Sequence, residues 1–381
     1  MKTIKVLGRY RSFLLNLFKS EEFKFEYDTN KNFEVPQKYK RILLRLFNLK
    51  IFDFLGLFSS YDGKSDLKYN YFSYNRFVRN VTNNYIVFLE NPTALVNYSH
   101  TKMKYGIGKI RVNNFIMNKH LKKIICMSKI CYSSFNEFYE EKHLEKVIQI
   151  YPLYPDLHES LQEEALYVDE KITNILFVGA TFVGKGGLEL CKVIEFFNSS
   201  QNEQFSFVVV TKIENIPEEF FAFLSEQKNV EIFDFNLTAN ELKELYVAAD
   251  IFLLPTRYES FGMVFLEAMK NGCALIGPDI YAINEMIKDT KNGFLYSPKL
   301  KPWDSSGIPN EDVLKRIKKM NNKFEIDNLL VEYLIEKLIY VDKNKDHLFN
   351  MKKESLSYSL NESFGEKSII CKWKETVGEL E

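Results

Sequence analysis

The second half of this chain alternates short apolar segments with amphipathic ones, and this alternation constrains the fold more than any other feature. The apolar runs predict β-strands at residues 174–178, 205–210, 230–233, 251–254 and 274–276. Amphipathic spacing predicts helices at residues 187–197, 239–248 and 261–270. Short apolar strands separated by helices are typical of a parallel, doubly wound sheet that is buried on both faces. We therefore predict a Rossmann-like α/β domain.

The first half shows the same pattern less clearly. Apolar runs predict strands at residues 1–7, 85–89, 122–127 and 146–151. The acidic, Pro-containing stretch 152–170 follows them and is predicted to link two domains. A length of 381 residues also suits two domains. The predicted α/β domains therefore comprise residues 1–157 and residues 158–345.

Charge is divided unequally between these halves, although 51 basic and 51 acidic residues give the whole chain a net charge of zero. Residues 1–157 hold 26 Lys and Arg against 14 Asp and Glu, a net charge of +12, and the remaining residues carry the opposite charge. This asymmetry indicates either an anionic partner (nucleic acid, anionic lipid or an anionic acceptor) or a solvated basic face without a partner. Because no nucleic-acid-binding motif accompanies the charge, we expect no nucleic-acid partner.

Residues 40–58 place apolar side chains at helical spacing among Lys and Arg. Such a basic amphipathic helix either faces a core or lies on an anionic membrane surface. No apolar run is long enough for a spanning helix, and the short run 13–18 lacks the cleavage site of a signal peptide. We expect a cytoplasmic protein whose basic domain docks on the inner face of the membrane.

Metal ligands are not recognisable in the sequence. The five Cys contain no CxxC, the five His have no ligand spacing, and no Asp-x-Asp occurs. We therefore expect no metal site, no cofactor and a reducing compartment.

A glycine-rich turn follows the predicted strand 174–178. Its sequence, GATFVGKG from Gly179 to Gly186, nearly matches the phosphate-binding loop of nucleoside triphosphatases. That loop needs a hydroxyl after its Lys to hold Mg²⁺, and Gly186 follows Lys185 here. What remains is a turn, with Gly184, Lys185 and Gly186, that suits an anion such as a diphosphate at a helix N-terminus.

Two carboxylates follow the predicted strand 251–254, in the stretch PTRYESFGMVFLEAM. Glu259 lies in the loop and Glu267 in the next helix, where both can accept hydrogen bonds from hydroxyl groups. The intervening residues lie at the helix N-terminus, whose backbone N–H groups favour anions. The predicted donor-binding residues of this segment are Ser260, Phe261, Gly262, Met263 and Val264. Carboxylates at this spacing also occur on ordinary solvated helices. The interpretation as a binding site therefore depends on the flanking residues.

This stretch resembles the family-4 retaining glycosyltransferases of GT-B fold, also called glycosyl transferases group 1. Their hallmark is E-x7-E, which Glu259 and Glu267 match within PTRYESFGMVFLEAMKNGCALIG. The resemblance extends to FVGATFVGKGG and AADIFLLP before it and to INEMI and NGFLY after it. It covers roughly residues 170–300 and is weak over residues 1–157.

The resemblance implies a role for each matching position. Glu259 would contact hydroxyls of the donor sugar, and Glu267 would contact the ribose of the nucleotide. Lys185 would offset the charge that develops on the departing diphosphate. The loop 233–236, including Phe235, would line the pocket of the base.

The resemblance also implies two Rossmann-like domains that face a central cleft, with a C-terminal helix that crosses back to the N-terminal domain. Residues 346–381 are the predicted return helices, with 363–380 as the crossing helix. Members commonly carry an Arg in the diphosphate clamp, where this chain has Ala180 and Gly184. Arg257 is the predicted replacement, with Arg9 and Arg11 as alternatives.

Many members also place a His near the reacting sugar, after a strand of the N-terminal domain. Asn91 is the nearest equivalent here, and it is equally compatible with a polar turn residue. We thus predict a retaining, metal-independent glycosyltransferase that moves a sugar from a nucleoside-diphosphate sugar to a hydroxyl of a cell-envelope glycan or lipid-linked acceptor. The alternative is a GT-B protein that binds the sugar nucleotide with weak or no activity, as the missing Arg suggests.

Overall fold

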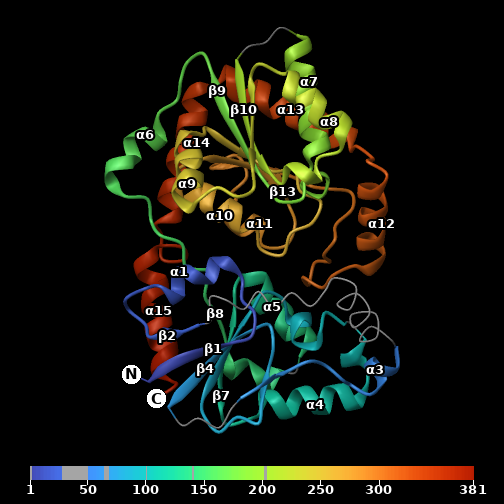
Figure 1. The fold of residues 1–381 in the computed structure, drawn as a ribbon, viewed down its shortest axis with the longest axis vertical. Helices are drawn as coiled ribbons and strands as arrows, with labels where there is room; N and C mark the ends of the chain where they lie inside the picture. The colour runs from blue at the N-terminus through green and yellow to red at the C-terminus, as the bar shows by residue number, and fades with distance from the viewer. Residues whose placement is uncertain (1, 28–49, 64–67, 100, 140, 201–203) are drawn as a thin grey trace. The chain divides into compact units, whose positions relative to one another are not determined.

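A computed structural model describes residues 2–27, 50–63, 68–99, 101–139, 141–200 and 204–381 (Figure 1). The chain divides into two compact units. The first holds the residues up to Leu153, together with Ser306–Ile308 and Glu366–Glu381. The second holds Tyr154–Ser305 and Pro309–Gly365. The division after Leu153 falls slightly before the boundary expected at residue 157.

The first unit is built on a six-stranded sheet in the order β2-β1-β4-β6-β7-β8, and all its paired strands are parallel. A separate parallel pair joins β3 and β5. The strands predicted at 1–7, 85–89, 122–127 and 146–151 are confirmed, each with slightly different ends. The strands are β1 (Thr3–Leu7), β2 (Phe25–Glu26), β3 (Tyr61–Asp62), β4 (Tyr69–Tyr74), β5 (Val78–Arg79), β6 (Tyr85–Leu89), β7 (Leu121–Cys126) and β8 (Val147–Gln149).

Helices of the first unit are short, and several are single 3-10 turns. They are η1 (Ser12–Leu14), α1 (Leu15–Phe18), α3 (Lys50–Phe54), η2 (Pro92–Val96), η3 (Lys102–Lys104), α4 (Gly106–Ile116), α5 (Lys129–Phe138), η4 (Glu141–Lys146) and α15 (Glu366–Gly378). Every residue of β6 is buried, as expected for an inner strand of a covered parallel sheet. Val112 and Ile116 of α4 join the same core.

The C-terminal helix α15 belongs to the first unit, which confirms the predicted return of the chain. Trp373 is buried there, with its ring centroid 6.2 Å from that of Phe72 and 5.9 Å from that of Phe88. The carbonyl oxygen of Leu380 accepts hydrogen bonds from the side-chain amides of Asn70 (3.1 Å) and Asn84 (3.0 Å). Aromatic packing and these two bonds hold the chain end against β4 and the start of β6.

The second unit contains a six-stranded sheet in the order β11-β10-β9-β12-β13-β14, again with every paired strand parallel. The strands predicted from the apolar runs are all present, and β14 adds an edge. They are β9 (Thr173–Val178), β10 (Phe205–Thr211), β11 (Val230–Asp234), β12 (Ile251–Leu253), β13 (Ala274–Pro278) and β14 (Gly293–Tyr296).

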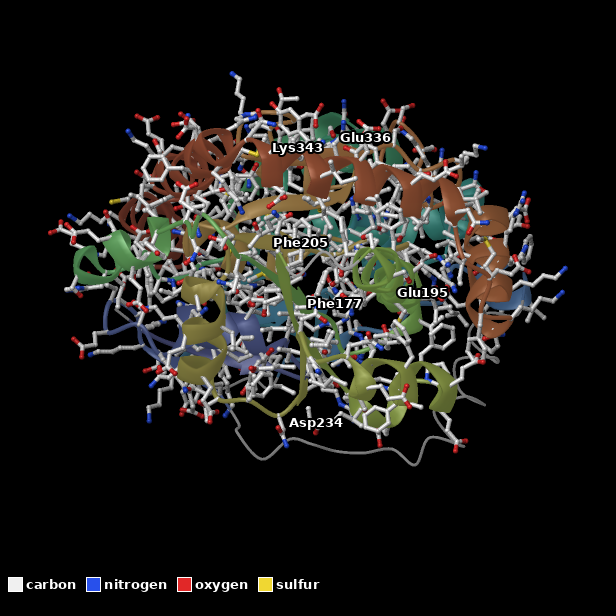
Figure 2. All side chains as sticks on the ribbon, turned by 90° about the horizontal axis from the view of Figure 1, so that it is seen from above. Phe177, Glu195, Phe205, Asp234, Glu336 and Lys343 are labelled. Carbon is white, nitrogen blue, oxygen red and sulfur yellow. The ribbon has the colours of Figure 1, made fainter. Side chains whose placement is uncertain are left out.

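Helices cover this sheet, and the amphipathic ones direct charged residues to solvent. Phe177 of β9 and Phe205 of β10 lie inside the unit, whereas Glu336 and Lys343 point outward from α13 (Figure 2). The helices are η5 (Glu159–Leu161), α6 (Gln162–Leu166), η6 (Val183–Lys185), α7 (Gly187–Ser199), η7 (Ile213–Asn215), α8 (Glu218–Glu226), α9 (Ala239–Ala248), α10 (Met263–Lys270), α11 (Ile283–Met286), α12 (Glu311–Asn322), α13 (Asn328–Lys343) and α14 (Lys345–Ser359).

Two predicted segments differ from the structure. The expected linker 152–170 carries η5 and α6, because Ala165 and Leu157 are apolar enough to pack in the core of the second unit. The predicted return helices begin at residue 346, which includes α14. This helix packs in the second unit instead, where Lys352 and Leu356 are buried. Of the helices in the predicted return segment 346–381, only α15 belongs to the first unit.

The structure describes only part of the predicted basic helix 40–58. Residues 40–49 lie outside the described residues, and the helix α3 ends at Phe54 rather than at residue 58. Over the residues that the structure describes, no helix has both the length and the apolar character needed to cross a membrane.

Candidate functional site

The topology of the second unit brings two loops together. From β9, the chain passes to β10 on one side, while β12 pairs with β9 on its other side. Open parallel sheets bind ligands at the carboxyl ends of strands where the strand order reverses in this way. The loops that leave β9 and β12 meet at this point, and they carry the glycine turn and Glu259 respectively.

The glycine turn is fixed by close backbone packing. Gly186 has φ +86°, and a Cβ atom added there would lie 2.3 Å from the carbonyl oxygen of Pro255. Only glycine therefore lets the turn after β9 touch the end of β12. At Gly179 an added Cβ would lie 2.8 Å from Cγ of Lys185, so this glycine leaves room for the lysine side chain.

The loop after β12 is held by contacts on both sides of Glu259. The indole Nε1–H of Trp303 donates to the carbonyl oxygen of Glu259 at 2.8 Å. Gly262 has φ +87° and caps α10, whose first hydrogen bond runs from the N–H of Phe265 to the carbonyl oxygen of Gly262 (2.9 Å). The loop therefore presents a helix N-terminus beside the carboxylate.

The predicted donor-binding residues differ in how far their side chains are exposed to solvent. Phe261 is buried, so its side chain belongs to the core and only its backbone is available for a ligand. Ser260, Met263 and Val264 are half-buried. Gly262 has no side chain, and its backbone leads directly into the first turn of α10.

Lys185 and Glu259 form an ion pair across the two loops, between Nζ and Oε1, although 74 residues separate them. The lysine side chain is 21% exposed and that of Glu259 15% exposed. A partly exposed ammonium group beside a helix N-terminus makes a site for an anion, and the carboxylate can accept bonds from hydroxyl groups. The structure thus brings together two of the residues to which the resemblance assigns catalytic roles, Lys185 and Glu259.

Glu267 lies in the second turn of α10, the helix that follows the loop of Glu259. Its Oε2 accepts a hydrogen bond from the hydroxyl of Tyr246 at 3.0 Å. Burial raises the pKa of Glu267, whereas the bond from Tyr246 acts in the opposite direction. The carboxylate is positioned by a buried phenol, and its oxygens suit a group that accepts hydrogen bonds from neutral hydroxyls.

Arg257, the predicted replacement for the Arg of the diphosphate clamp, has several partners within the second unit. Its guanidinium forms an ion pair with the buried carboxylate of Glu189 and donates to the side chain of Asn321 (2.6 Å) and to the carbonyl oxygen of Glu325. Glu189 also accepts a bond from the N–H of Asp327 at 3.0 Å. A buried carboxylate needs a cationic partner, so Arg257 joins the β12 loop to α7 and α12. These contacts give Arg257 a structural role, and its place in a diphosphate clamp stays a prediction.

Asn91 lies in the first unit, after β6, and acts as a helix cap. Its side-chain oxygen accepts hydrogen bonds from the N–H (2.9 Å) and the hydroxyl of Thr93. The side chain is buried, and these contacts match the alternative of a polar turn residue. Its predicted catalytic role gains no support from this geometry.

The neighbouring Glu90 belongs to a polar cluster that no sequence motif indicates. The buried carboxylate of Glu90 accepts hydrogen bonds from the hydroxyls of Tyr74 (2.6 Å) and Tyr98. The backbone N–H of Glu90 donates to the side-chain oxygen of Asn75 (3.0 Å). The cluster lies at the carboxyl end of β6. Nothing in the spacing of these residues signals the contact, because β4 and β6 come together only through sheet pairing.

Phe235 is exposed beside a cavity of about 400 Å³ at the carboxyl ends of β10 and β11. The cavity is lined by Lys212, Ile213, Glu214, Asp234 and Phe235. The loop expected to line a base pocket thus borders an open space at the same edge of the sheet as Lys185 and Glu259. Its binding of a base stays a prediction.

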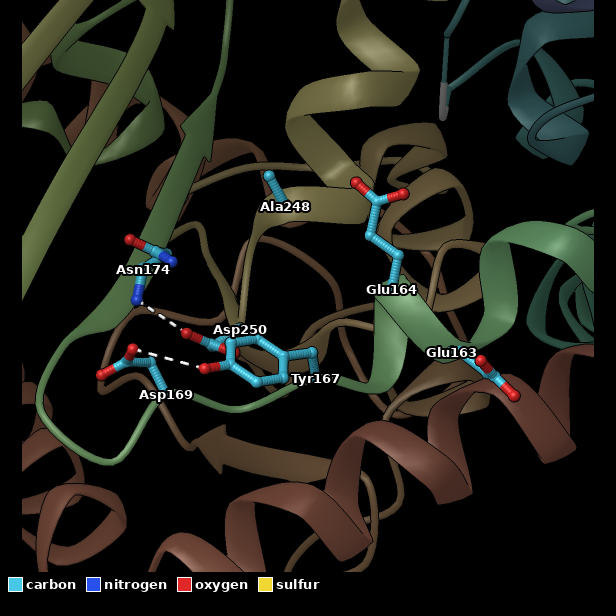
Figure 3. Close-up of a pocket in the computed structure, with 7 residues that line it drawn as sticks. All are labelled: Glu163, Glu164, Tyr167, Asp169, Asn174, Ala248 and Asp250. Carbon is cyan, nitrogen blue, oxygen red and sulfur yellow. Dashed lines mark hydrogen bonds between the residues drawn. The ribbon is translucent and has the colours of Figure 1, made fainter.

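Another cavity, of about 490 Å³, lies at the opposite edge of the sheet (Figure 3). It borders the amino ends of β9 and β12 and is lined by Asn174 and Asp250 together with Glu163, Glu164 and Asp169. Four carboxylates would repel a diphosphate, and Asp250 is already paired with Lys352 at 2.8 Å. This acidic cavity is therefore a poor site for a nucleotide.

Within the described part of the chain, no group of three or more His, Cys, Asp or Glu side chains is arranged to hold a metal ion. The arrangement at the carboxyl edge offers carboxylates for hydroxyls, and backbone N–H groups with one ammonium for phosphate oxygens.

Residues 158–306 match the model of the protein family described as "Glycosyl transferases group 1". The matched segment includes the glycine turn, Phe235 and both carboxylates of the E-x7-E motif. The resemblance to group 1 glycosyltransferases is thus supported for this segment of the second unit.

Curated relatives match over a similar stretch. The GtfA subunit of the UDP-N-acetylglucosamine–peptide N-acetylglucosaminyltransferase from Limosilactobacillus reuteri is 25% identical over 143 residues, 37% of this chain and 23% of that protein. An uncharacterised glycosyltransferase from Methanocaldococcus jannaschii is 30% identical over 131 residues, 34% of this chain and 33% of that protein. The chain therefore spans a third or less of the length of these relatives.

Solved structures match almost the whole chain. Anabaena HepE in complex with UDP and glucose has a TM-score of 0.60 at 12% identity, covering 99% of this chain and 100% of that chain. WaaG, a glycosyltransferase involved in lipopolysaccharide biosynthesis, has a TM-score of 0.57 at 14% identity, covering 98% of both chains. At these identities the likeness shows the fold alone: two α/β domains with parallel sheets, the GT-B class that the resemblance implies.

Proposed function

We propose that this chain is a glycosyltransferase that moves a sugar from a nucleoside-diphosphate sugar to a hydroxyl of an acceptor. The proposal depends most on one observation: Lys185 and Glu259, 74 residues apart, form an ion pair at the carboxyl ends of adjacent strands, beside the N-terminus of α10. The match of residues 158–306 to group 1 glycosyltransferases supports it.

The donor would lie along the carboxyl edge of the second sheet. Its diphosphate would accept hydrogen bonds from N–H groups at the starts of α7 and α10, and Lys185 would exchange its bond to Glu259 for a phosphate oxygen. Glu259 would then accept bonds from hydroxyls of the sugar, while Glu267 would accept bonds from the ribose. The cavity beside Phe235 would hold the base.

The proposed reaction retains the configuration of the sugar. The bond between the anomeric carbon and the diphosphate oxygen breaks, and the acceptor oxygen attacks from the same face. The acceptor proton passes to the departing diphosphate, so no protein nucleophile is required. Lys185 stabilises the charge that develops on that leaving group. No metal ion is needed in this scheme, and activity in the presence of EDTA would test that expectation.

The acceptor proposed is a glycan of the cell envelope or a lipid-linked sugar. The basic first unit supports this class, because its net charge attracts anionic glycans and anionic lipid surfaces. We propose that the protein acts in the cytoplasm, at the inner face of the membrane.

A test is release of nucleoside diphosphate from a panel of UDP- and GDP-sugars, with and without candidate acceptors. Glu259→Gln keeps the size of the side chain but removes its charge, and it should lower turnover at least about 100-fold, the usual scale for a lost transition-state contact. Glu244→Gln, on the exposed face of α9 in the same unit, is the matched control and should turn over normally. Normal turnover by Glu259→Gln would refute the site.

A binding protein without turnover is the second candidate. The use of Arg257 in an ion pair with Glu189 favours it, because the diphosphate clamp then lacks the cation expected from the family pattern. Nucleotide sugar that binds without any release of diphosphate, across the panel and all acceptors, would select this candidate.

A further inference from the structure

Trp303 is buried although it lies outside the regular elements of the second unit, in the irregular segment after β14. The residue is only 5% exposed. Its backbone forms an isolated antiparallel bridge with Pro309. Beside this bridge, the N–H of Asn310 donates to the carbonyl oxygen of Pro302 at 2.8 Å. Irregular segments normally run over the surface, so a large aromatic side chain buried in one fixes that segment to its surroundings.

Two tyrosine rings pack against the indole. Tyr258 stacks on it, with centroids 5.5 Å apart and ring planes inclined by 18°. Tyr281 lies closer, with centroids 4.2 Å apart and planes inclined by 32°. Tyr258 directly precedes Glu259, and Tyr281 follows β13. Trp303 thus joins the loop after β12 to the loop after β13, at the carboxyl edge of the sheet.

The backbone of Tyr281 is held in an unfavourable conformation. Its φ is +45°, in the left-handed region that is disfavoured for bulky side chains. Such a conformation persists only where surrounding contacts hold it, and strained residues are concentrated at functional sites. Here Tyr281 is buried and packs on the indole. This strain indicates that the aromatic cluster, which we define as Tyr258, Tyr281 and Trp303, serves the site as well as the fold.

The hydrogen bond from Trp303 orients the peptide group that follows Glu259. The indole Nε1–H donates to the carbonyl oxygen of Glu259 at 2.8 Å. That oxygen and the N–H of Ser260 belong to one planar peptide group, and in a trans peptide they point in opposite directions. The described residues contain no cis peptide bond. The indole therefore directs the N–H of Ser260 away from itself, and it fixes the backbone from which the side chain of Glu259 projects.

We propose that Trp303 is a positioning residue for the transfer reaction. It acts through the peptide group between Glu259 and Ser260, which keeps the carboxylate of Glu259 at Lys185 and turns the N–H of Ser260 toward the donor. Groups that are oriented in advance need no reorganisation when the reaction occurs. This inference rests on the proposed function, because the orientation of Glu259 affects turnover only if Glu259 contacts the donor.

Trp373 provides a matched comparison, since the chain contains two Trp. It is also buried, and its ring stacks on Phe88 with centroids 5.9 Å apart and planes inclined by 22°. Among the described residues, its indole N–H has no hydrogen-bond partner. Substitution of either Trp by Phe removes the same atoms, but only Trp303→Phe removes a hydrogen bond.

The first test compares the release of nucleoside diphosphate by the two variants. Trp303→Phe keeps an aromatic ring against Tyr258 and Tyr281, and it should lower kcat at least about tenfold while KM changes less than about threefold. Trp373→Phe should keep both constants within about twofold of those of the unaltered chain. Melting temperatures of the same preparations separate a kinetic effect from a loss of folded protein.

The second test uses the fluorescence of Trp303 and needs no turnover. Trp373→Phe leaves Trp303 as the single Trp of the chain, so its emission reports on the indole beside Glu259. A nucleoside diphosphate that draws Lys185 away from Glu259 changes the charge near this indole. Addition of UDP or GDP should therefore shift the emission of Trp373→Phe, with a midpoint equal to the Kd from calorimetry. The emission of Trp303→Phe should not change.

The outcomes separate this inference from the proposed function. A normal kcat in folded Trp303→Phe would overturn the role of Trp303 alone. Unchanged emission of Trp373→Phe, at a nucleotide concentration where calorimetry shows binding, would do the same and decides the matter if Trp303→Phe does not fold. Absence of both nucleotide binding and turnover in the unaltered chain would overturn the proposed function and this inference with it.

Discussion

Substitution of Lys185 by Met tests the electrostatic role proposed for this residue. Nζ lies against the carboxylate of Glu259 and is partly exposed, so it can turn toward an anion that binds at the same edge. An ammonium about 4 Å from a developing negative charge, at an effective dielectric constant near 20, contributes about 4 kcal/mol. That value corresponds to about 10³ in rate, and single electrostatic contacts in enzymes usually give 10²–10³.

We therefore expect Lys185→Met to lower kcat/KM by about 10²–10³. Its effect on stability should be small, about 1 kcal/mol, because the ion pair is partly open to solvent. The assay measures release of nucleoside diphosphate while the donor concentration is varied at a saturating acceptor concentration. Urea unfolding of the same preparation measures stability. Lys192→Met is the matched control, since Lys192 lies on α7 with an exposed side chain paired to Glu195.

The kinetic pattern distinguishes the proposed role from simple binding. A loss mainly in kcat indicates that Lys185 acts on the leaving group, whereas a loss confined to KM indicates uniform binding of the donor. An activity of Lys185→Met within about threefold of the unaltered enzyme would refute the reasoning.

Further predictions concern stability and its dependence on pH. Gly186→Ala should lower the free energy of unfolding by about 2–4 kcal/mol, measured by urea denaturation, because its φ of +86° and the contact with Pro255 both oppose a Cβ atom; an unchanged midpoint would contradict the turn geometry. Lys352→Met should cost about 3–5 kcal/mol by leaving the buried carboxylate of Asp250 without its cation, and adding Asp250→Asn should restore part of the loss; additive effects of the two substitutions would contradict the pairing. Burial raises the pKa of Glu267 in the folded state, so its contribution to stability is fully present below the ordinary value of 4.5 and is lost as pH rises through the folded pKa. Glu267→Gln removes this titration, so its melting temperature relative to the unaltered chain should increase from acid to neutral pH, and a pH-independent difference would contradict the assigned shift.

The strands of the second unit could be predicted because their signals are local. Each predicted strand is a short apolar run, and those of β9 and β12 end at Gly179 and Pro255 respectively. Strand pairing in a doubly wound sheet then brings the carboxyl ends of neighbouring strands together. That rule places Lys185 and Glu259 at one edge without knowledge of any side-chain contact.

Contacts that depend on long-range packing could not be predicted. Arg257 is predicted at a diphosphate because it lies beside the carboxylate pair, on the same ligand-facing edge of the sheet, and this role is untested. Its actual partner, Glu189, lies 68 residues away on α7 and is buried by helices whose placement the sequence pattern does not specify. The bond from Trp303 to the backbone of Glu259 has the same origin, since Trp303 follows β14 in an irregular segment.

The first unit was less predictable for a different reason. Its strand β4 contains polar residues such as Asn70 and Ser73, both buried, so it does not form an apolar run. The hydroxyls around Glu90 come from β4 and from the segment after η2, which only the folded sheet brings together. A sequence pattern could therefore locate β6 but not the cluster at its end.

Amide hydrogen exchange in the presence of UDP or GDP tests most directly whether the carboxyl edge of the second unit binds a nucleoside diphosphate. The account predicts slower exchange, with at least one of the two nucleotides, in the turn 182–188 and at the start of α10 in residues 260–266. It predicts no change around the acidic cavity at residues 163–169. Protection at the acidic cavity, or no protection in either loop with any nucleoside diphosphate, would contradict it.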